Sequence, residues 1–423
     1  MYYGFNGSVY YTSANASAAT YATYTSTDII GIALDLDNHT VQFFKNNSSQ
    51  GTISLPNGNY TFAMGDGATG YSGGWTANFG QKSFTYTPPT GFLALQQDNL
   101  PETAKGISGL VWTKNRDATD NHQLYDSSRG KQLVFASNTT AASTTVVDGL
   151  QKFLAGGQQI EDDVSINTSG ESYVSWNWTA NGGTTASNPD GSITSTVQAN
   201  TTAGFSIVEY TGNGGNAAAT IGHGLSSAPE WMMVKFKDSV AAWSVYHKSV
   251  GATKRLQLNS TTTPLTDANI FNNTEPTSTV FSVGSSLNQT TVYNFIVYCW
   301  HGVDGFSKFG SYTGNGSTDG TFVYTGFRPA WVMYKNITTA SQWVIMDTKR
   351  SAFNPVGLNL LANATSVEDD GGTSQRKMDI LSNGFKLRVG NYTDTNKSAN
   401  TYVYMAFAEH PFVGDGTSPV TAR

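Results

Sequence analysis

A unit of about 100 residues occurs twice in the sequence, and this duplication restricts the possible folds more than any other feature. The first copy starts at Gly204 with GFSIVEYTGNG, and the second starts at Gly305 with GFSKFGSYTGNG. Trp231 matches Trp331, and a second matched pair of tryptophans follows 12 residues later in each copy. Solenoid repeats are shorter, about 20 to 50 residues, so each copy has the size of a small domain.

A more degraded third copy precedes these two. The stretch GLVWTKNRDATDNHQLYDSSRG, which starts at Gly109, can be laid on the residues from Trp231 to Gly251, and ESYVSWNWTANGG at Glu171 corresponds to the closing strand of the unit. We therefore expect a separate N-terminal domain at residues 1–100, a degenerate repeat at 106–203, two well-preserved repeats at 204–304 and 305–412, and a C-terminal tail at 413–423.

Within each unit the pattern predicts short β-strands. AWVMYKN and QWVIMDT are apolar throughout or alternate with period two, and clusters of Gly, Asn, Asp and Ser bound them. Charged residues make up 13% of the chain, aromatic residues 12%, and there are 44 glycines. We therefore predict an all-β protein of tandem, jelly-roll-like β-sandwiches, packed against one another. The one helix expected is short, in VDGLQKFLAGG near Val147.

Charge and hydropathy argue against several classes of partner. The formal net charge is −6 and no long Lys/Arg run occurs, so a nucleic-acid partner is not expected. No apolar run approaches the roughly 20 residues of a membrane span, and MYYGFNGSVYY lacks the features of a signal peptide. We expect no membrane insertion and no processing by the secretory route.

An acidic cluster near the N-terminus allows three interpretations. Asp35, Asp37 and His39 lie together in DIIGIALDLDNHTVQFFKN, which could be a metal site, a catalytic dyad or a turn. The flanking residues alternate as in two strands, with DNHT between them, so we predict a β-hairpin. Asp37 and Asn38 would then cap the backbone of the turn, and no metal is expected.

The same region resembles the second half of a SPRY domain, a concanavalin-like β-sandwich. The resemblance covers about residues 1–100 and rests on GIALDLDNHTVQFFKNN, GNYTFAMGDG and WTANFGQKSFTYTPPTGFLAL, in that order. It implies a binding module without catalytic residues. Only about 27 residues precede the hairpin, fewer than is usual in the family, so the sandwich is expected to be pared down or completed by another chain.

The repeats resemble an uncharacterised domain of marine bacteriophage structural proteins, especially those of cyanobacterial phages. The shared sequence motifs are YTGNG at Tyr312 to Gly316, GFRPAWVMYK at Gly326 to Lys335, WVIMDTKR at Trp343 to Arg350 and LSNGFKLR at Leu381 to Arg388. The resemblance covers about residues 106–412. It implies a virion structural protein, such as a tail fibre, and no particular chemistry.

A search for catalytic chemistry finds few candidates. There is no GxSxG elbow, the six histidines are scattered, and Cys299 is the only cysteine, which we interpret as buried and structural. The acidic clusters IEDD at Ile160 and VEDDGG at Val367 could supply glycosidase carboxylates or bind Ca²⁺. Their polar flanks favour exposed loops. We predict no catalytic residue, no metal and no cofactor.

Three residues are candidates for ligand binding. Trp176 and Trp178 in SWNWT point to the same face of one strand, are freer to be exposed than the other tryptophans, and could stack on sugar rings. His223 lies between two glycines in IGHGL and could approach a ligand, or could be a turn histidine. The four tryptophans at matched repeat positions are assigned to the core: Trp231, Trp243, Trp331 and Trp343.

Taken together, these patterns predict a non-enzymatic protein on the surface of a phage particle. We expect a tail fibre or spike that binds host surface glycans and contacts other virion proteins, since hydroxyl and amide side chains suit hydrogen bonding to sugars. A capsid-attached fibre or decoration protein is the alternative within this class, and a polysaccharide depolymerase is the alternative from another class. Surface attachment benefits from avidity, so a homotrimer is predicted.

Overall fold

A computed structural model describes most of the chain, which divides into two compact units, Met1–Pro101 and Glu102–Arg423. Each unit is described below by itself. The residues described are 8–9, 19–56, 76–80, 82–94, 108–154, 157–369 and 375–409. The predicted tail at 413–423 lies outside them.

The N-terminal unit contains a three-stranded antiparallel sheet with the order β3-β4-β5 and a short β1-β2 ladder. The strands are β1 (Ser8–Val9), β2 (Ala19–Thr20), β3 (Ile30–Asp35), β4 (Thr40–Lys45) and β5 (Ser48–Ser54). Phe43 and Ile53 are buried on one face of this sheet. Ile32 and Leu34, which belong to the same sheet, are exposed. Residues 76–80 and 82–94 contain no strand.

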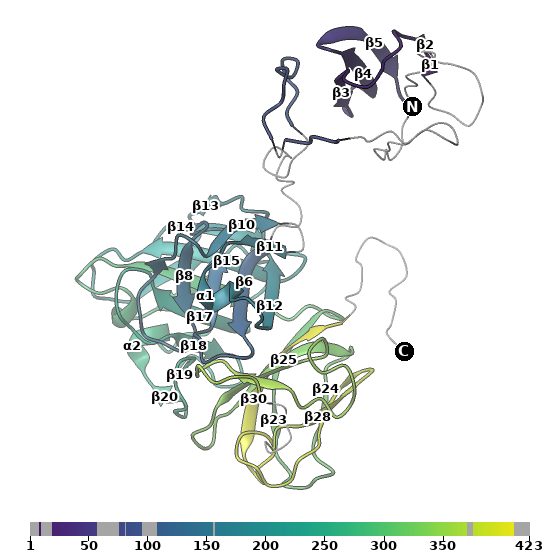
Figure 1. The fold of residues 1–423 in the computed structure, drawn as a ribbon. Coiled ribbons are helices and arrows are strands. Elements are labelled where there is room, and N and C mark those ends of the chain that lie inside the picture. The colour runs from purple at the N-terminus through teal and green to yellow at the C-terminus, as the bar shows by residue number, and fades with distance from the viewer. Residues whose placement is uncertain are drawn as a thin grey trace. The chain divides into compact units, whose positions relative to one another are not determined.

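The C-terminal unit is built from three repeats, each with one larger and one smaller antiparallel sheet (Figure 1). In the first repeat the larger sheet has the order β12-β6-β7-β8-β9, and the smaller is the hairpin β10-β11. The elements are β6 (Ser108–Asn115), β7 (Gln123–Asp126), β8 (Leu133–Ala136), β9 (Thr144–Thr145), β10 (Leu150–Leu154), β11 (Gly157–Ile160), α1 (Val164–Asn167) and β12 (Tyr173–Thr179).

The second repeat has the largest sheet, with the order β13-β14-β15-β22-β17-β18-β19-β20, and the small sheet β16-β21. The strands are β13 (Ala186–Asn188), β14 (Ser195–Asn200), β15 (Phe205–Thr211), β16 (Ala219–Gly222), β17 (Trp231–Phe236), β18 (Ser244–His247), β19 (Lys254–Gln257), β20 (Leu265–Thr266), β21 (Val280–Val283) and β22 (Asn294–Trp300). Two short helices, α2 (Ala268–Phe271) and η2 (Ser285–Leu287), belong to the same repeat.

The third repeat has the sheets β23-β30-β25-β26-β27 and β24-β29-β28. The strands are β23 (Ser307–Thr313), β24 (Phe322–Tyr324), β25 (Pro329–Asn336), β26 (Trp343–Asp347), β27 (Asn359–Leu361), β28 (Met378–Leu381), β29 (Gly384–Leu387) and β30 (Thr401–Ala408). The chain is thus all-β, as predicted. None of the helices in the described part of the chain has the length and apolar character to cross a membrane.

The duplication seen in the sequence is visible in the strand register. In the second repeat Trp231 of β17 lies opposite His247 of β18, and in the third repeat Trp331 of β25 lies opposite Asp347 of β26. The corresponding pair in the first repeat is Leu110 and Asp126. The ladders β12-β6-β7-β8, β22-β17-β18-β19 and β30-β25-β26-β27 therefore correspond strand by strand.

Two details of the sequence prediction differ from the structure. Strands β13 and β14 precede Gly204, yet β14 pairs with β15, so the second repeat's sheet begins inside the segment 106–203. The expected helix near Val147 is wrong: Leu150–Leu154 is strand β10, which pairs with β11. Leu150 and Phe153 are buried there, and a short apolar run of this kind is compatible with either structure.

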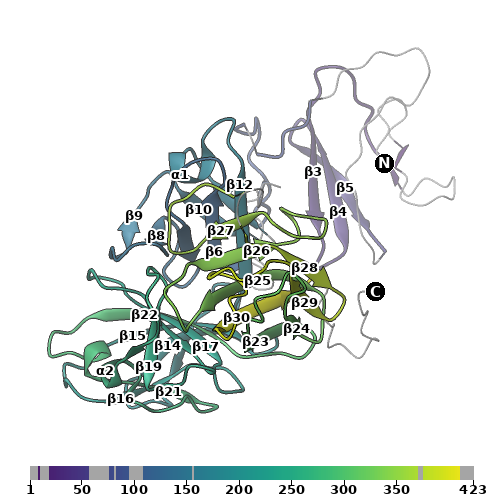
Figure 2. The same cartoon turned by 90° about the horizontal axis from the view of Figure 1, so that it is seen from below.

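Each larger sheet buries both of its faces. In β17, Met232 and Val234 pack in the core of the second repeat, whereas Trp231 and Met233 point into a core shared by all three repeats. Figure 2 shows the strands of the three repeats grouped around this common centre. The repeats are therefore sectors of one body with a shared core. The predicted packing of the modules against one another thus takes the form of one core that all three repeats share.

Candidate functional site

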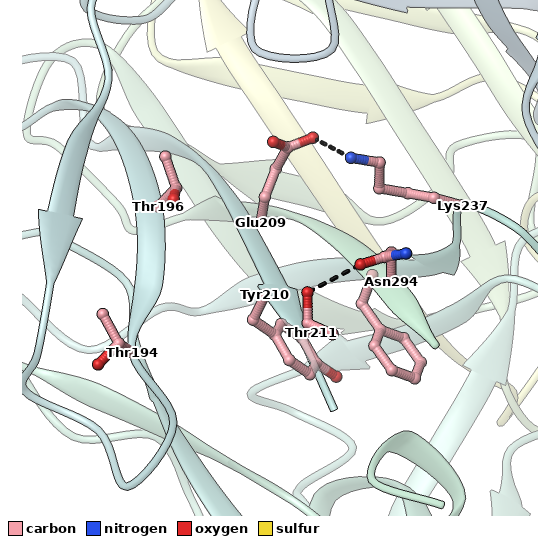
Figure 3. Close-up of a pocket in the computed structure, with 8 residues that line it drawn as sticks. Thr194, Thr196, Glu209, Tyr210, Thr211, Lys237 and Asn294 are labelled. Atoms are coloured by element: carbon pink, nitrogen blue, oxygen red, sulfur yellow. Dashed lines mark hydrogen bonds and ion pairs between the residues drawn. The ribbon is translucent and has the colours of Figure 1, made fainter. Parts of the chain in front are cut away.

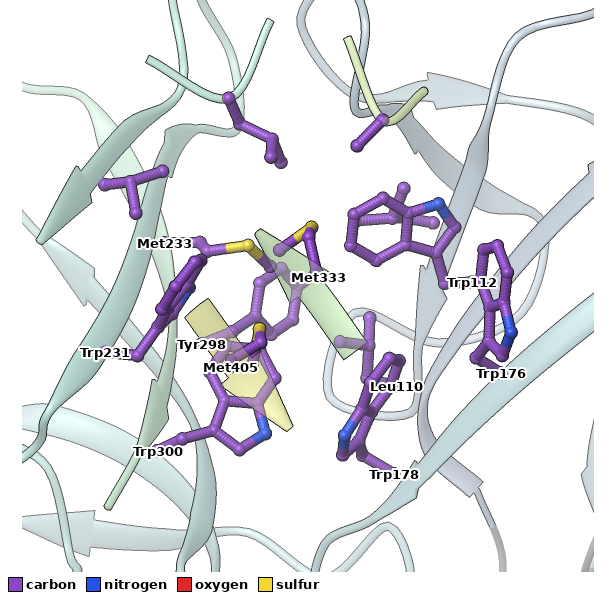
Figure 4. Close-up of a cluster of buried hydrophobic side chains, with 14 of the residues drawn as sticks. Leu110, Trp112, Trp176, Trp178, Trp231, Met233, Tyr298, Trp300, Met333 and Met405 are labelled. Carbon is purple, nitrogen blue, oxygen red and sulfur yellow. The ribbon is translucent and has the colours of Figure 1, made fainter. Parts of the chain in front are cut away.

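Buried side chains from all three repeats meet in the shared core, and Figure 4 shows tryptophans of the first two repeats beside Met333 and Met405 of the third. The Trp178 ring lies 5.5 Å from that of Trp331 and 6.0 Å from that of Trp300, both with edge-to-face geometry. Such pairs add about 0.5 to 1.5 kcal/mol each beyond the area they bury. The tryptophans of this core are Trp112, Trp176, Trp178, Trp231, Trp243, Trp300, Trp331 and Trp343. The assignment of the four repeated tryptophans to the core is confirmed.

The second and third repeats are each joined to the preceding repeat by an equivalent indole hydrogen bond. Trp243 Nε1 of the second repeat donates to the Ala136 carbonyl of the first, over 2.9 Å. Trp343 Nε1 of the third donates to the Gln257 carbonyl of the second, also over 2.9 Å. The acceptors occupy the same register position, since Ala136 pairs with Gln123 and Gln257 pairs with Ser244. The interfaces between consecutive repeats are therefore copies of each other.

His122 occupies the corresponding position in the first repeat. Its Nδ1 accepts a 2.9 Å hydrogen bond from Trp112 Nε1. Burial, and then the positive charge of Lys114, lower the pKa of His122 to about 3, although the Leu361 carbonyl of the third repeat favours the protonated form. Trp112 occupies the position at which the other repeats have a methionine, and His122 occupies the position at which they have a tryptophan. The large and the smaller side chain have therefore exchanged positions.

Buried lysines reinforce the same interfaces. Lys235 Nζ donates to the Thr140 carbonyl of the first repeat over 2.8 Å, and Lys335 Nζ donates to the Thr261 carbonyl of the second over 3.1 Å. Burial lowers the pKa of both ammonium groups to about 8. Each ammonium is also bound to a carbonyl of its own repeat. These groups are satisfied within the fold, which identifies them as structural.

A network of ion pairs joins the third repeat to the first. Glu368 pairs with Arg116 of the first repeat over 2.6 Å and with Arg350 over 2.8 Å. Arg350 also pairs with Asp347 over 2.6 Å, and Asp347 accepts a 3.1 Å hydrogen bond from Trp176 Nε1. The exposed loop expected for VEDDGG is therefore wrong at Glu368, because its carboxylate is drawn inward by two guanidinium groups.

The two candidate sugar-stacking tryptophans lie in the interior. Trp176 and Trp178 do share one face of β12, as predicted, but that face points into the shared core, and each side chain is only 8% exposed. The expectation of exposure is wrong. Alternation along a strand shows which residues share a face, but it does not show what covers that face.

The third candidate, His223, is also buried. Its Nε2 lies 3.1 Å from the Thr277 carbonyl, and its Nδ1 accepts a hydrogen bond of 3.1 Å from the Leu225 amide. Burial lowers its pKa. Both ring nitrogens are thus occupied by neighbouring backbone groups, which corresponds to the turn-histidine interpretation. Cys299 is likewise buried, as predicted, and burial raises the pKa of its thiol above the usual range.

The acidic cluster at the N-terminus forms a turn. Asp35 Oδ1 accepts hydrogen bonds from the amides of Asp37 and Asn38, over 3.0 and 2.9 Å, and His39 has a positive φ of 52°. The capping side chain is therefore Asp35, where Asp37 and Asn38 were predicted. At the other acidic cluster, Asp163 caps helix α1 by accepting from the Ser165 amide. Among the described residues no cluster of His, Cys, Asp and Glu could hold a metal ion.

An open polar depression of about 230 Å³ lies on the second repeat, over β14, β15, β22 and the residue after β17 (Figure 3). Its lining comprises Thr194, Thr196, Glu209, Tyr210, Thr211, Lys237, Asn294 and Phe295. Glu209 Oε1 pairs with Lys237 Nζ over 2.7 Å, and the Thr211 hydroxyl donates to Asn294 Oδ1 over 2.8 Å. The Tyr210 and Phe295 rings stack at 4.7 Å and are themselves buried.

The chemistry of this depression suits binding better than catalysis. Its lining contains one carboxylate, Glu209, which Lys237 neutralises. Glycoside hydrolysis generally uses two carboxylates on either side of the scissile bond. Hydroxyl, amide and paired charged groups on rigid strands can instead exchange hydrogen bonds with a polyol. No sequence motif marked this site, because its residues come from four separate segments.

The structure thus defines a class of protein, an all-β body of three fused repeats around one aromatic core. The family described as Domain of unknown function (DUF7483) matches residues 101–411, and the chain belongs to this family. No curated protein matches the chain. Among solved structures the chain has a faint similarity to BpGH86A, a beta-porphyranase of glycoside hydrolase family 86 from the human gut bacterium Bacteroides plebeius. The TM-score is 0.13 at 9% identity, over 60% of this chain and 42% of the other, so the chain spans less than half of that protein.

Proposed function

We propose that the protein is a bacteriophage structural protein, exposed on the particle as a tail fibre or spike, that attaches to host surface glycans without cleaving them. The observation that carries the binding role is the open depression on the second repeat, in which hydroxyl and amide groups surround the Glu209–Lys237 pair. The proposed location on a phage particle rests on the resemblance of the repeats to phage structural proteins. A capsid-attached fibre or decoration protein is the alternative position within the virion.

The internal architecture supports a scaffold role. The ion pairs, buried lysines and tryptophans that could have carried chemistry are used to join the repeats, as at Lys235, Glu368 and Trp343. A closed core of this kind gives a rigid body whose outer faces are free to present a binding surface. The SPRY-like N-terminal unit would add a second binding module, completed by another virion chain.

The body already contains three similar sectors, so a homotrimer would present nine of them. We retain the homotrimer in the proposal because repeated copies raise avidity for a polymer surface. The molar mass of the full chain in solution measures this directly by light scattering. A monomer in solution together with single copies in the particle would contradict it.

A binding experiment tests the attachment role. Labelled full-length protein should adhere to cyanobacterial cells of the host strain, and the paired variant Glu209→Gln with Thr211→Ala should bind less. A reducing-end assay on the extracted envelope polysaccharide should show no release of sugar ends. Release of reducing ends would identify a depolymerase instead, and a failure to adhere to any host cell would contradict the proposal.

A further inference from the structure

We propose that the outer face of the β24-β29-β28 sheet in the third repeat is a stacking site for a neutral polysaccharide chain. This inference rests on the proposed attachment function and names a second contact for it. Phe322 and Tyr324 lie on either side of Val323 in β24, and Val323 is buried in the core of the third repeat. Because successive side chains of a strand point to opposite faces, both rings point outward. They are 43% and 61% exposed.

The register places these rings on a flat part of the sheet. Phe322 pairs with Lys386, and Tyr324 pairs with Gly384, which has no side chain. Atoms of the Phe322 ring lie 3.0 and 3.1 Å from the point where a Cβ of Gly384 would stand, so the ring rests against bare backbone. Two rings at positions i and i+2 of a strand are about 7 Å apart along it. Together they offer a continuous apolar surface with polar edges.

The charged groups around the rings neutralise one another. Lys386 Nζ pairs with Asp319 Oδ1 over 2.6 Å, and Arg388 lies 3.4 Å from the same carboxylate. Arg388 Nε lies 2.5 Å from Asp379 Oδ2. Two cations therefore face two anions, which leaves no net charge to select a charged polymer. Paired groups of this kind still donate and accept hydrogen bonds, as sugar hydroxyl groups require.

The second repeat shows that the fold does not need these rings. Val323 in the third repeat corresponds to Ile221, because each lies opposite a buried phenylalanine of the neighbouring strand. The flanking positions in the second repeat are therefore Thr220 and Gly222. There the segment that contains Ile193 runs beside β16 at the edge of the sheet, through a bridge to Ile221 and a hydrogen bond of 3.1 Å to the Thr220 carbonyl.

This difference argues for a ligand. Large exposed aromatic side chains on an edge strand favour aggregation, and proteins usually avoid them unless they bind something. The rings of Phe322 and Tyr324 present an apolar face to the C–H face of a pyranose, and the paired charges meet its hydroxyl groups. A neutral polysaccharide matches both features, whereas an apolar protein strand would leave the charges at the rim without a role.

The test uses the full-length chain and its variants in affinity electrophoresis through gels that contain dextran, a mannan or a galactan. At least one polymer should retard the wild type, and the double variant Phe322→Ala with Tyr324→Ala should lose at least tenfold in affinity. Tyr324→Phe should retain binding, because it preserves the ring. Phe353→Ala serves as the control, since Phe353 is 86% exposed and lies outside strands β24, β28 and β29.

The outcomes separate this inference from the proposed function. If the wild type binds a polymer or host cells and the double variant binds equally well, the stacking site is wrong and the attachment role survives. If binding falls only in the Glu209→Gln and Thr211→Ala variant, the second repeat carries recognition alone. If the double variant changes the oligomeric mass instead, the face joins two copies of the chain. A wild type that binds neither polymer nor cells would overturn both proposals.

Discussion

Both units of the chain are built from short antiparallel strands. They differ in how completely other residues cover the faces of their sheets. In the N-terminal unit, the described sheet buries Phe43 and Ile53 but leaves Ile32 and Leu34 exposed. In the C-terminal unit, each large sheet is covered on both faces, once by its own repeat and once by the other two.

This difference shows that the strand pattern alone does not determine whether both faces of a β-sheet become buried. A sheet becomes a core element when a second apolar surface covers each face, because the free energy of burial grows with the apolar area removed from water. The repeats supply those surfaces to each other. Substitutions in the shared core should therefore have large effects on stability, and substitutions in the N-terminal sheet should have small ones.

The largest loss of stability is expected at the interface between the third repeat and the first. Glu368→Gln removes the carboxylate that pairs with Arg116 and Arg350, and it leaves these two guanidinium groups with the single carboxylate of Asp347. We expect the free energy of unfolding of the body to fall by about 3 to 5 kcal/mol. Chemical denaturation followed by tryptophan fluorescence measures this.

A matched control is the pair of Glu230 and Lys248, whose side chains are 28% and 41% exposed at 2.8 Å. Glu230→Gln should cost less than about 1 kcal/mol. Equal losses in the two variants would show that the closing network is no more important than a surface ion pair.

A second prediction concerns the exchanged side chains at the first repeat's interface. Trp112→Met should cost about 2 to 4 kcal/mol, because it opens a cavity and removes the hydrogen bond to His122. His122→Trp alone should also destabilise the fold by overpacking. The double variant reproduces the arrangement of the other repeats, so its cost should be smaller than the sum of the single costs by about 2 kcal/mol. Additive costs in a double-mutant cycle would show that the two positions do not compensate.

The buried histidines predict a dependence of stability on pH. Burial lowers the pKa of His122 to about 3 and that of His247 to about 4, both from 6.5. The unfolded chain therefore takes up protons at a higher pH than the folded one. Stability should be complete above pH 6.5 and fall as the pH drops toward 4.5, by on the order of 2 kcal/mol per histidine.

Urea denaturation at pH 7.5 and pH 4.5 measures this loss. The variant Trp112→Met with His122→Trp lacks one of the buried histidines whose pKa is lowered, and it keeps His223 and His247, so its loss between these pH values should be smaller than that of the wild type. A profile that stays flat between pH 6.5 and 4.5 would contradict the neutral state of the buried rings.

The smallest loss of stability is expected from substitutions in the hairpin between β3 and β4. Asp35→Ala removes the side chain that accepts from the amides of Asp37 and Asn38, and should weaken the hairpin only locally. Asp37→Ala should cost less, and host attachment should survive both changes. Hydrogen exchange of the hairpin amides measures the local effect, and the denaturation midpoint of the body should not move. A shift of that midpoint would mean that the two units unfold together.

The sequence by itself determined the all-β class, the repeat and the core position of the four repeated tryptophans. Period-two alternation and turn residues predict short strands, and the recurrence of Trp231 at Trp331 requires equivalent surroundings. The hairpin at Asp35 was equally predictable, because turn chemistry is local. These features depend on residues that are close in the chain or that recur at a fixed interval.

Only the tertiary structure decided which strand faces meet. Trp176 and Trp178 lie in the core because β12 faces the other two repeats, and the Glu368 side chain is only 9% exposed because it pairs with Arg116, 252 positions away. The binding candidates of the outer surface, Glu209 with Lys237 and Phe322 with Tyr324, depend in the same way on what remains uncovered once the body has closed. The cover of a face comes from distant residues, and local periodicity carries no information about them.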